Sequence, residues 1–419
     1  MAPFRDWFGK HPVPGEERQK LRQLWSHIAC PPLWVTLLAC VAILFVRKPD
    51  MFRNPQFWGE DGWFYWWARN RAGLIVFTAQ YAGYLHTVPR LVAALATLAD
   101  PRWAPAIFVA TAFGFTLYVA ARTQSSRCPL PRHAGCALAV VLVPDAFEVL
   151  LNITCLQWVL DGGLLLLLIS ADARRWWQHV HDVCVILLFG LTGPVSILLA
   201  PLFVWRAWYR RSPASCVLAA LALTTGAVQA WTVWQNPTPV SDQPIAMDAL
   251  LTVPGMRVAG SLLAGYFVPW DYPRAIETLL GIATLLAVVA LAARQGVARL
   301  ERTWLALVFV ALLASALYRC RFVLPDLRHA TFGSRYFFPL QLIVVWLVLA
   351  AATDARRWLA RSAALLALWS LVINLPRLRE PALTDFHWAD YVGKLRAGEA
   401  VDVPVNPAPW VVTFPAKKP

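Results

Sequence analysis

Charged residues are scarce in this chain of 419 residues: Asp, Glu, Lys and Arg together make up 15%, whereas 58% of the residues are hydrophobic. The mean hydropathy is +0.52, and the apolar residues form long runs, unlike the narrow stripe of an amphipathic helix. To cross a hydrocarbon core of roughly 30 Å, a helix needs about 17–25 mostly apolar residues, because its peptide groups must bond within the segment. The sequence therefore predicts an all-α polytopic membrane protein and excludes a water-soluble domain.

The cysteines exclude two further classes of site. All eight are scattered, mostly inside or beside apolar runs, with no CxxC pair and no His/Cys ligand spacing. This pattern argues against a zinc site and against a disulfide framework. A glycine-rich phosphate loop and internal repeats are also lacking. The formal net charge is +14, but the basic residues lie in short clusters between apolar runs, which is typical of membrane orientation and not of nucleic-acid binding.

Hydropathy predicts about eleven membrane-spanning helices. They are expected near residues 31–47, 85–99, 103–121, 134–151, 155–171, 183–204, 214–233, 275–293, 303–318, 337–353 and 358–375. Short basic loops favour the cytoplasm. The chain should therefore have a cytoplasmic arm (1–30), a membrane domain (31–375) whose first outer loop is 48–84 and contains interfacial helices, and a short extracytoplasmic tail (376–419).

For residues 85–205 the sequence also fits a second path through the membrane, which we call the second threading. It treats 85–99 as a dip into the membrane and breaks 183–204 at Thr192-Gly-Pro194 into two half-spans. It returns the arginines between residues 122 and 175 to the cytoplasmic side, where positive charge is favoured.

Two adjacent carboxylates stand in the first outer loop. Glu60 and Asp61 follow Trp58 and begin an aromatic segment that suits a helix in the membrane interface. A carboxylate at that depth, partly shielded from water, can act as a general base toward a hydroxyl group. Acids are also common at helix N-termini, so a capping role is the alternative.

Cationic and polar residues recur at the expected outer ends of other spans. Arg90 follows Tyr81, Tyr84 and His86 at the start of a short apolar run. An arginine there is costly unless it pairs or binds an anion, although its head can also snorkel to the interface. Glu148 and Asn152 interrupt apolar sequence, and such residues usually face the bundle interior or a wet cavity.

The loop 319–339 holds four arginines and one aspartate on a side where positive charge is disfavoured. Arg328 and Arg335, the latter followed by Tyr336, are suited to a lipid phosphate, because a guanidinium grips phosphate oxygens bidentately. Contact with anionic headgroups in general is the alternative.

These stretches together resemble a family of polytopic envelope proteins in the GT-C class of glycosyltransferases. The class shares an acidic motif in its first outer loop, here Phe57-Trp-Gly-Glu-Asp-Gly62. Other stretches resemble poorly characterised bacterial members: Tyr81 to Arg90, Leu191-Thr-Gly-Pro194, Ser334-Arg-Tyr-Phe337, and Val403 to Pro407 with Trp410.

The resemblance implies a GT-C-like protein of the bacterial inner membrane that transfers a sugar, with inversion, from a polyprenyl-phosphate donor to a glycan or lipid acceptor at the outer face. Asp61 would be the base and Glu60 its partner or a metal ligand. The donor phosphate would contact Arg335, Arg90, Arg328 and His86. The substrate cavity would be lined by Tyr81, Tyr84, Trp58, Glu148, Asn152 and Tyr336, and the lipid tail would lie in an apolar groove between helices. Whether a divalent cation binds is left open, because the second acid is not assigned; the candidates are Asp145, Glu148 and Asp271.

Three other classes fit parts of the pattern. A transporter or flippase of lipid-linked saccharide would use the same arginines to line a pathway, but the paired broken helices of such folds are not visible. A polysaccharide polymerase or ligase would rely on the outer arginines and not on Asp61. A structural subunit without catalysis would need neither.

Overall fold

The computed structural model describes residues 31–71, 73–131, 133–237, 246–265, 272–294, 298–321 and 333–416. It is about 71% helical. Within these residues, six helices are long and apolar enough to cross a membrane: Pro101–Arg122, Pro213–Gln235, Arg274–Ala293, Arg299–Arg319, Ser334–Ala351 and Arg357–Arg377. Shorter apolar helices accompany them. The fold is that of an all-α multi-pass membrane protein, while the predicted count of eleven spans is not established.

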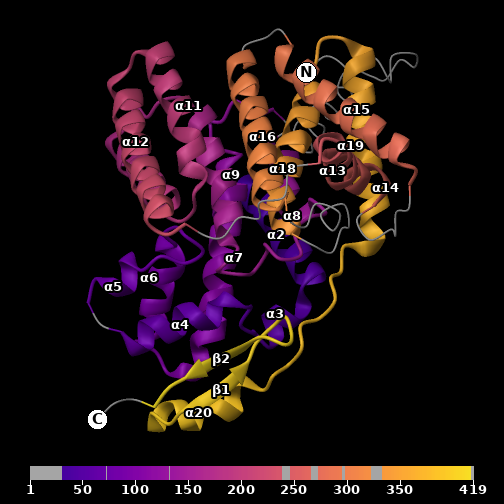
Figure 1. Ribbon diagram of the computed structural model, residues 1–419. Coiled ribbons are helices and arrows are strands. Elements are labelled where there is room, and N and C mark those ends of the chain that lie inside the picture. Colours follow the sequence, from indigo (N-terminus) through magenta and orange to yellow (C-terminus); the bar gives the residue numbers. More distant parts are fainter. Residues whose placement is uncertain are drawn as a thin grey trace, which may run out of the picture.

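The elements of the membrane domain follow the chain in this order: α2 (Leu33–Arg47), α3 (Pro49–Arg53), α4 (Glu60–Asn70), α5 (Ile75–Thr78), α6 (Thr87–Ala96), η1 (Pro101–Trp103), α7 (Ala104–Arg122), α8 (His133–Leu142), α9 (Leu156–Ile169), α10 (Trp176–Gly190), α11 (Val195–Arg210), α12 (Pro213–Gln235), α13 (Ala249–Pro254), the π-helix η2 (Gly255–Gly260), α14 (Ser261–Ala264), α15 (Arg274–Ala293), α16 (Arg299–Arg319), α18 (Ser334–Ala351), α19 (Arg357–Asn374) and η4 (Leu375–Arg377). Figure 1 shows α9 in the middle of this bundle, and nearly all of its residues are buried.

One end of the bundle is held together by charge pairs. Asp172 accepts hydrogen bonds from Arg206 and Arg210, and Arg127 pairs with Asp182. Arg127 therefore lies at the same end as the basic end of α11, as the second threading predicts. That threading also fits two other features: the chain breaks between α10 and α11, and α6, at about 1.5 Å per residue, is far too short to span.

One sequence-based boundary was wrong, and one stretch between predicted spans contains short helices. The span predicted at 134–151 ends at Leu142, because Pro144 cannot continue a helix. The stretch 234–274, for which hydropathy predicts no spanning helix, contains α13, η2 and α14, and α13 and η2 pack on α15. The backbones touch there: a Cβ on Gly255 would lie 2.1 Å from the Glu277 carbonyl oxygen, and one on Gly281 would lie 1.9 Å from that of Leu251. Such close helix contacts require glycine.

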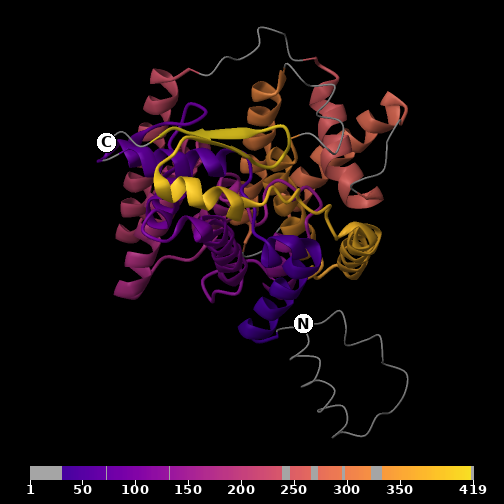
Figure 2. The same ribbon diagram turned by 90° about the horizontal axis from the view of Figure 1, so that it is seen from below.

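The predicted tail forms an ordered appendage that consists of α20 (Trp388–Ala397) and a hairpin of β1 (Val401–Pro404) and β2 (Val411–Phe414). The appendage lies across the end of the bundle that holds α3 and α4, as both ribbon views show (Figures 1 and 2). Trp388 donates to the Pro101 carbonyl at 2.9 Å, and a Cβ on Gly62 would lie 2.7 Å from Val412. The chain's last segment thus covers the first predicted outer loop.

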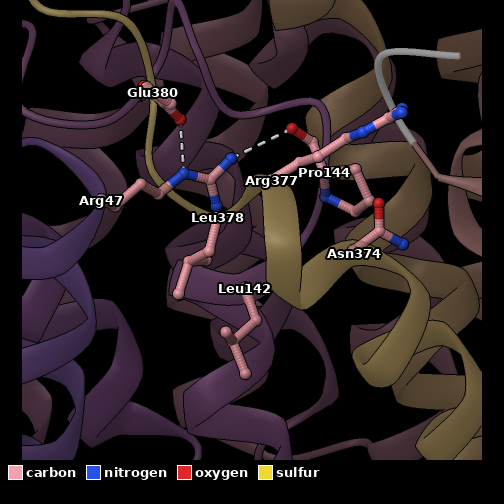
Figure 3. A pocket seen from close by; sticks show the side chains of 7 residues that line it. All are labelled: Arg47, Leu142, Pro144, Asn374, Arg377, Leu378 and Glu380. Carbon is pink, nitrogen blue, oxygen red and sulfur yellow. Dashed lines mark hydrogen bonds and ion pairs between the residues drawn. The ribbon is translucent and has the colours of Figure 1, made fainter.

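A buried clasp fastens the start of this segment to α2. Glu380 pairs with Arg47 and, at 3.2 Å, with Lys48. Arg47 also donates to the carbonyls of Val141, Val143 and Pro144, and Figure 3 shows its guanidinium between Glu380 and Pro144. The clasp consequently fixes the segment after α8, which carries Asp145 and Glu148.

Candidate functional site

Asp61 links the start of α4 to the segment before α9. Its Oδ1 accepts hydrogen bonds from the Thr154 hydroxyl (2.6 Å) and the Thr154 backbone N–H (2.9 Å). Its Oδ2 accepts one from the Trp58 N–H (3.3 Å), and the residue is 2% exposed. Asp61 thus has three protein donors and almost no contact with solvent.

Burial raises the pKa of Asp61 to about 7, although the hydrogen bonds from Thr154 and Trp58 oppose the shift. Because the folded protein holds this proton more tightly than the unfolded chain, the stabilising contribution of the proton is complete below pH 4 and is lost as the pH rises through 7.

We expect the free energy of unfolding to fall between pH 4 and 7 by up to about 4 kcal/mol more in the wild type than in Asp61→Asn. Denaturation of both proteins between pH 4 and 8 measures this, and parallel pH profiles would contradict it.

Glu60 lies in a different environment from its neighbour. It is half-buried, and its Oε1 accepts a hydrogen bond from the Tyr81 hydroxyl at 3.1 Å. Its other oxygen, Oε2, accepts no hydrogen bond from the described residues. Of the two acids, Glu60 is therefore the one that a substrate can reach, while the predicted role of Asp61 as the base stays a prediction.

The aromatic residues of the second predicted stretch form one cluster. His86 stacks on Tyr84, with ring centroids 4.4 Å apart, and meets Tyr81 edge-on at 5.8 Å. Tyr84 accepts a hydrogen bond from Gln157 at 2.9 Å. Burial and the nearby Arg90 lower the pKa of His86 to about 3, so its imidazole is neutral at physiological pH.

The break between α10 and α11 positions this cluster. The Leu191 carbonyl accepts both the N–H and the hydroxyl of Thr87, and the Thr192 hydroxyl accepts the Val88 N–H. These bonds satisfy the free amides at the start of α6. The break at Thr192-Gly-Pro194 thus separates α10 from α11, and the Leu191 carbonyl and the Thr192 hydroxyl at this break cap the start of α6.

Arg90 is a buried cation with aromatic neighbours. It is 1% exposed, and its guanidinium carbon lies 5.0 Å from the ring centre of Phe64 and 5.2 Å from that of Trp67. Its Nε and Nη1 have no hydrogen-bond partner within the described residues, and no carboxylate there pairs with it. A desolvated guanidinium without an anion is costly, so this position favours an anionic ligand.

Arg335 is paired, in contrast to Arg90. Its Nη1 donates to Glu148 Oε2 at 3.0 Å, and about a third of its side chain is exposed. The guanidinium lies over the Tyr336 ring at 5.2 Å. Asn152 supports this pair by donating to the Glu148 carbonyl. The structure therefore joins three of the predicted cavity residues to the predicted phosphate residue.

The remaining predicted residues have other outcomes. The Trp58 ring is buried edge-on against Phe147 at 5.7 Å and acts in packing. Arg328 and Asp271 lie outside the described residues. Among the described residues, no group of three or more His, Cys, Asp or Glu side chains is arranged to hold a metal ion.

Asp145, a candidate for the second acid, belongs to a buried network whose other members, Arg257 and Gln341, were missed at the sequence level. Asp145 pairs with Arg257 of η2 at 2.7 Å and accepts a hydrogen bond from Gln341 at 2.6 Å. Arg257 also lies 4.3 Å from the Phe337 ring centre. The signal that could have found it is an arginine in an apolar stretch, Leu250 to Leu263, which is itself broken by Pro254 and two glycines.

An apolar cavity of about 710 Å³ lies between α8, α14, α15, α18 and α19. Almost all of its lining side chains are aliphatic. Two of its walls continue in sequence toward the site: Pro144 lies four residues before Glu148, and Val344 of α18 lies nine residues after Arg335. The cavity has the character of the apolar groove that the resemblance implies for a lipid tail.

Comparison with protein-family models, with curated proteins and with solved structures found no match. Function is therefore inferred from the chemistry of the site.

Proposed function

We propose that the chain is an inverting glycosyltransferase that takes a sugar from a polyprenyl-phosphate donor and acts at the outer face of a bacterial inner membrane. The observation that carries this proposal is the meeting of Glu60, Tyr81, Glu148 and Arg335 at one end of the membrane helices. Both pairs flank the start of α9, because Gln157 donates to Tyr84 of the Tyr81 segment and Trp158 packs on Tyr336 beside Arg335. Carboxylates for proton transfer and cations for a leaving phosphate are the groups that this reaction requires.

In this proposal Glu60 takes the proton of the acceptor hydroxyl. The hydroxyl oxygen attacks the anomeric carbon, the bond from that carbon to the phosphate oxygen breaks, and polyprenyl phosphate leaves with the bonding electrons. A general base must reach the proton that it abstracts, and Glu60 is the more accessible acid. Asp61 positions the start of α4 through Thr154.

Two arginines would stabilise the charge that develops on the phosphate. Among the described residues no carboxylate pairs with Arg90, whereas Arg335 is held by Glu148. Arg90 lies one helical turn after His86, which stacks on Tyr84. The neutral imidazole adds no charge of its own, so the phosphate would be held by the guanidinium groups.

The lipid tail of the donor would lie in the apolar cavity. A larger side chain in the wall of the cavity tests this placement. Ala367 of α19 lines the cavity, whereas Ala364 on the same helix is exposed and does not. Ala367→Phe is expected to raise the KM for the lipid donor about tenfold with little change in kcat, because overpacking opposes the tail. Ala364→Phe should leave both constants unchanged, and equal effects of the two variants would place the tail elsewhere.

The proposal as a whole is tested by comparing a strain that lacks the chain with the same strain after complementation. Loss of a transferase should remove one sugar from the envelope glycans and lead to accumulation of the matching polyprenyl-phosphate sugar on the outer leaflet. Accumulation on the cytoplasmic leaflet alone would favour a flippase. Unchanged glycans and unchanged lipid-linked sugars would overturn the proposal.

A further inference from the structure

The appendage sends a rigid turn to the residues just before Glu60. Within the turn, the Val405 N–H donates to the Trp410 carbonyl at 2.9 Å and the Trp410 N–H to the Pro407 carbonyl at 3.2 Å. Asn406 fixes the turn to the first loop: its N–H donates to the Phe57 carbonyl at 3.2 Å, and its carbonyl accepts the Gly59 N–H.

The side chain of Asn406 anchors the turn on its other side. It exchanges two hydrogen bonds of 2.9 Å with the backbone of Thr384. Asn406 is 3% exposed. The position of the turn relative to α4 is consequently set by four hydrogen bonds of Asn406, two of them to Phe57 and Gly59, which precede Glu60.

Trp410 stands exposed in this otherwise well-held turn. It is 40% exposed, although Val412 and Phe414 in the same hairpin are buried. Its ring lies 3.9 Å from the point where a Cβ on Gly59 would be, and Gly59 is the residue before Glu60. Pro407, Ala408 and Pro409 beside it are exposed as well.

Membrane-interface anchoring explains other exposed tryptophans more directly than this one. Trp231 and Trp234 lie at the end of α12, a helix long enough to span, where aromatic residues gather at the bilayer boundary. Trp410 lies instead in the turn of the appendage, with its ring beside Gly59 at the start of α4.

We propose that Trp410 is a stacking platform for a sugar ring of the acceptor. A sugar ring presents C–H groups on its face and hydroxyl groups at its edge, so the face can pack on an indole while the edge forms hydrogen bonds. Gly59, which the Trp410 ring approaches, directly precedes Glu60, so a sugar on Trp410 would lie beside the start of α4. That the sugar belongs to the acceptor rests on the proposed function, whereas the binding of a sugar to Trp410 does not.

Saturation-transfer NMR on the full chain in lipid nanodiscs tests this inference. The probes are methyl α-D-mannopyranoside, methyl β-D-glucopyranoside and methyl β-D-galactopyranoside, used one at a time. We expect at least one to receive saturation on the C–H protons of one ring face. Trp410→Ala should lower that signal about fivefold, and Trp410→Phe should retain most of it because the aromatic face remains. Trp231→Ala, at an exposed tryptophan far along the chain, should match the wild type.

Absence of a signal with all three glycosides, or an equal signal in Trp410→Ala, would overturn the inference. A signal that falls equally in Trp231→Ala would show non-specific contact with interfacial tryptophans and would overturn it as well. Glu60→Gln separates this inference from the proposed function: it should lose transfer and keep the sugar signal. Sugar binding without transfer in the wild type would refute the reaction and leave the platform standing.

Discussion

Glu60→Gln is expected to lower sugar transfer by about 100- to 10,000-fold, the range typical of a lost general base. The substitution keeps the size of the side chain and leaves an oxygen to accept the hydrogen bond of Tyr81. It removes only the capacity to take a proton. Initial rates of transfer in lipid-reconstituted protein, with donor and acceptor extracted from the complemented strain, measure the effect.

Glu399→Gln is the matched control, because Glu399 is an exposed glutamate next to α20 in the appendage. It should transfer sugar at the wild-type rate. Asp61→Asn completes the comparison: full transfer by Glu60→Gln together with none by Asp61→Asn would return the role of base to Asp61. Full transfer by both variants would remove the acidic pair from the reaction.

Polar residues in apolar sequence were the part of the site that the sequence could predict. A membrane penalises each unpaired charge, so residues such as Glu60, Glu148 and Arg335 stand out for a physical reason. The structure joins Glu60 to Tyr81 and Glu148 to Arg335, which lie 21 and 187 positions apart in the chain. The residues of both pairs could thus be singled out from composition and position, whereas their function stays a prediction.

The pairing of those residues could not be predicted, because hydropathy carries no information on contacts. Asp145 and Glu148 lie three residues apart, yet one binds Arg257 and the other binds Arg335. Which acid meets which arginine depends on the end of α8 and on the clasp at Arg47, both of which are set by tertiary packing. The segment of Arg257 was missed because Pro254 and the glycines around it interrupt its apolar run.

Arg257→Gln is expected to destabilise the protein by about 3–5 kcal/mol, because it removes a charged partner from the buried carboxylate of Asp145. Asp145 is fully buried and Arg257 is 1% exposed. Gln341 would still donate to Asp145, but a neutral amide does not replace a guanidinium beside a buried charge. Unfolding in mixed micelles, followed by the loss of helical signal, measures the change.

The exposed pair of Arg274 and Asp248 supplies the contrast. Its side chains are 69% and 45% exposed, so Arg274→Gln should cost less than about 1 kcal/mol. Asp145→Asn combined with Arg257→Gln should recover most of the loss, since two neutral amides can bond where two charges stood. If the double variant were as unstable as Arg257→Gln alone, the guanidinium would act through its packing on Phe337 and not through the charge of Asp145. Arg257 would then stabilise the first turn of α18, which carries Arg335, through its packing on the Phe337 ring.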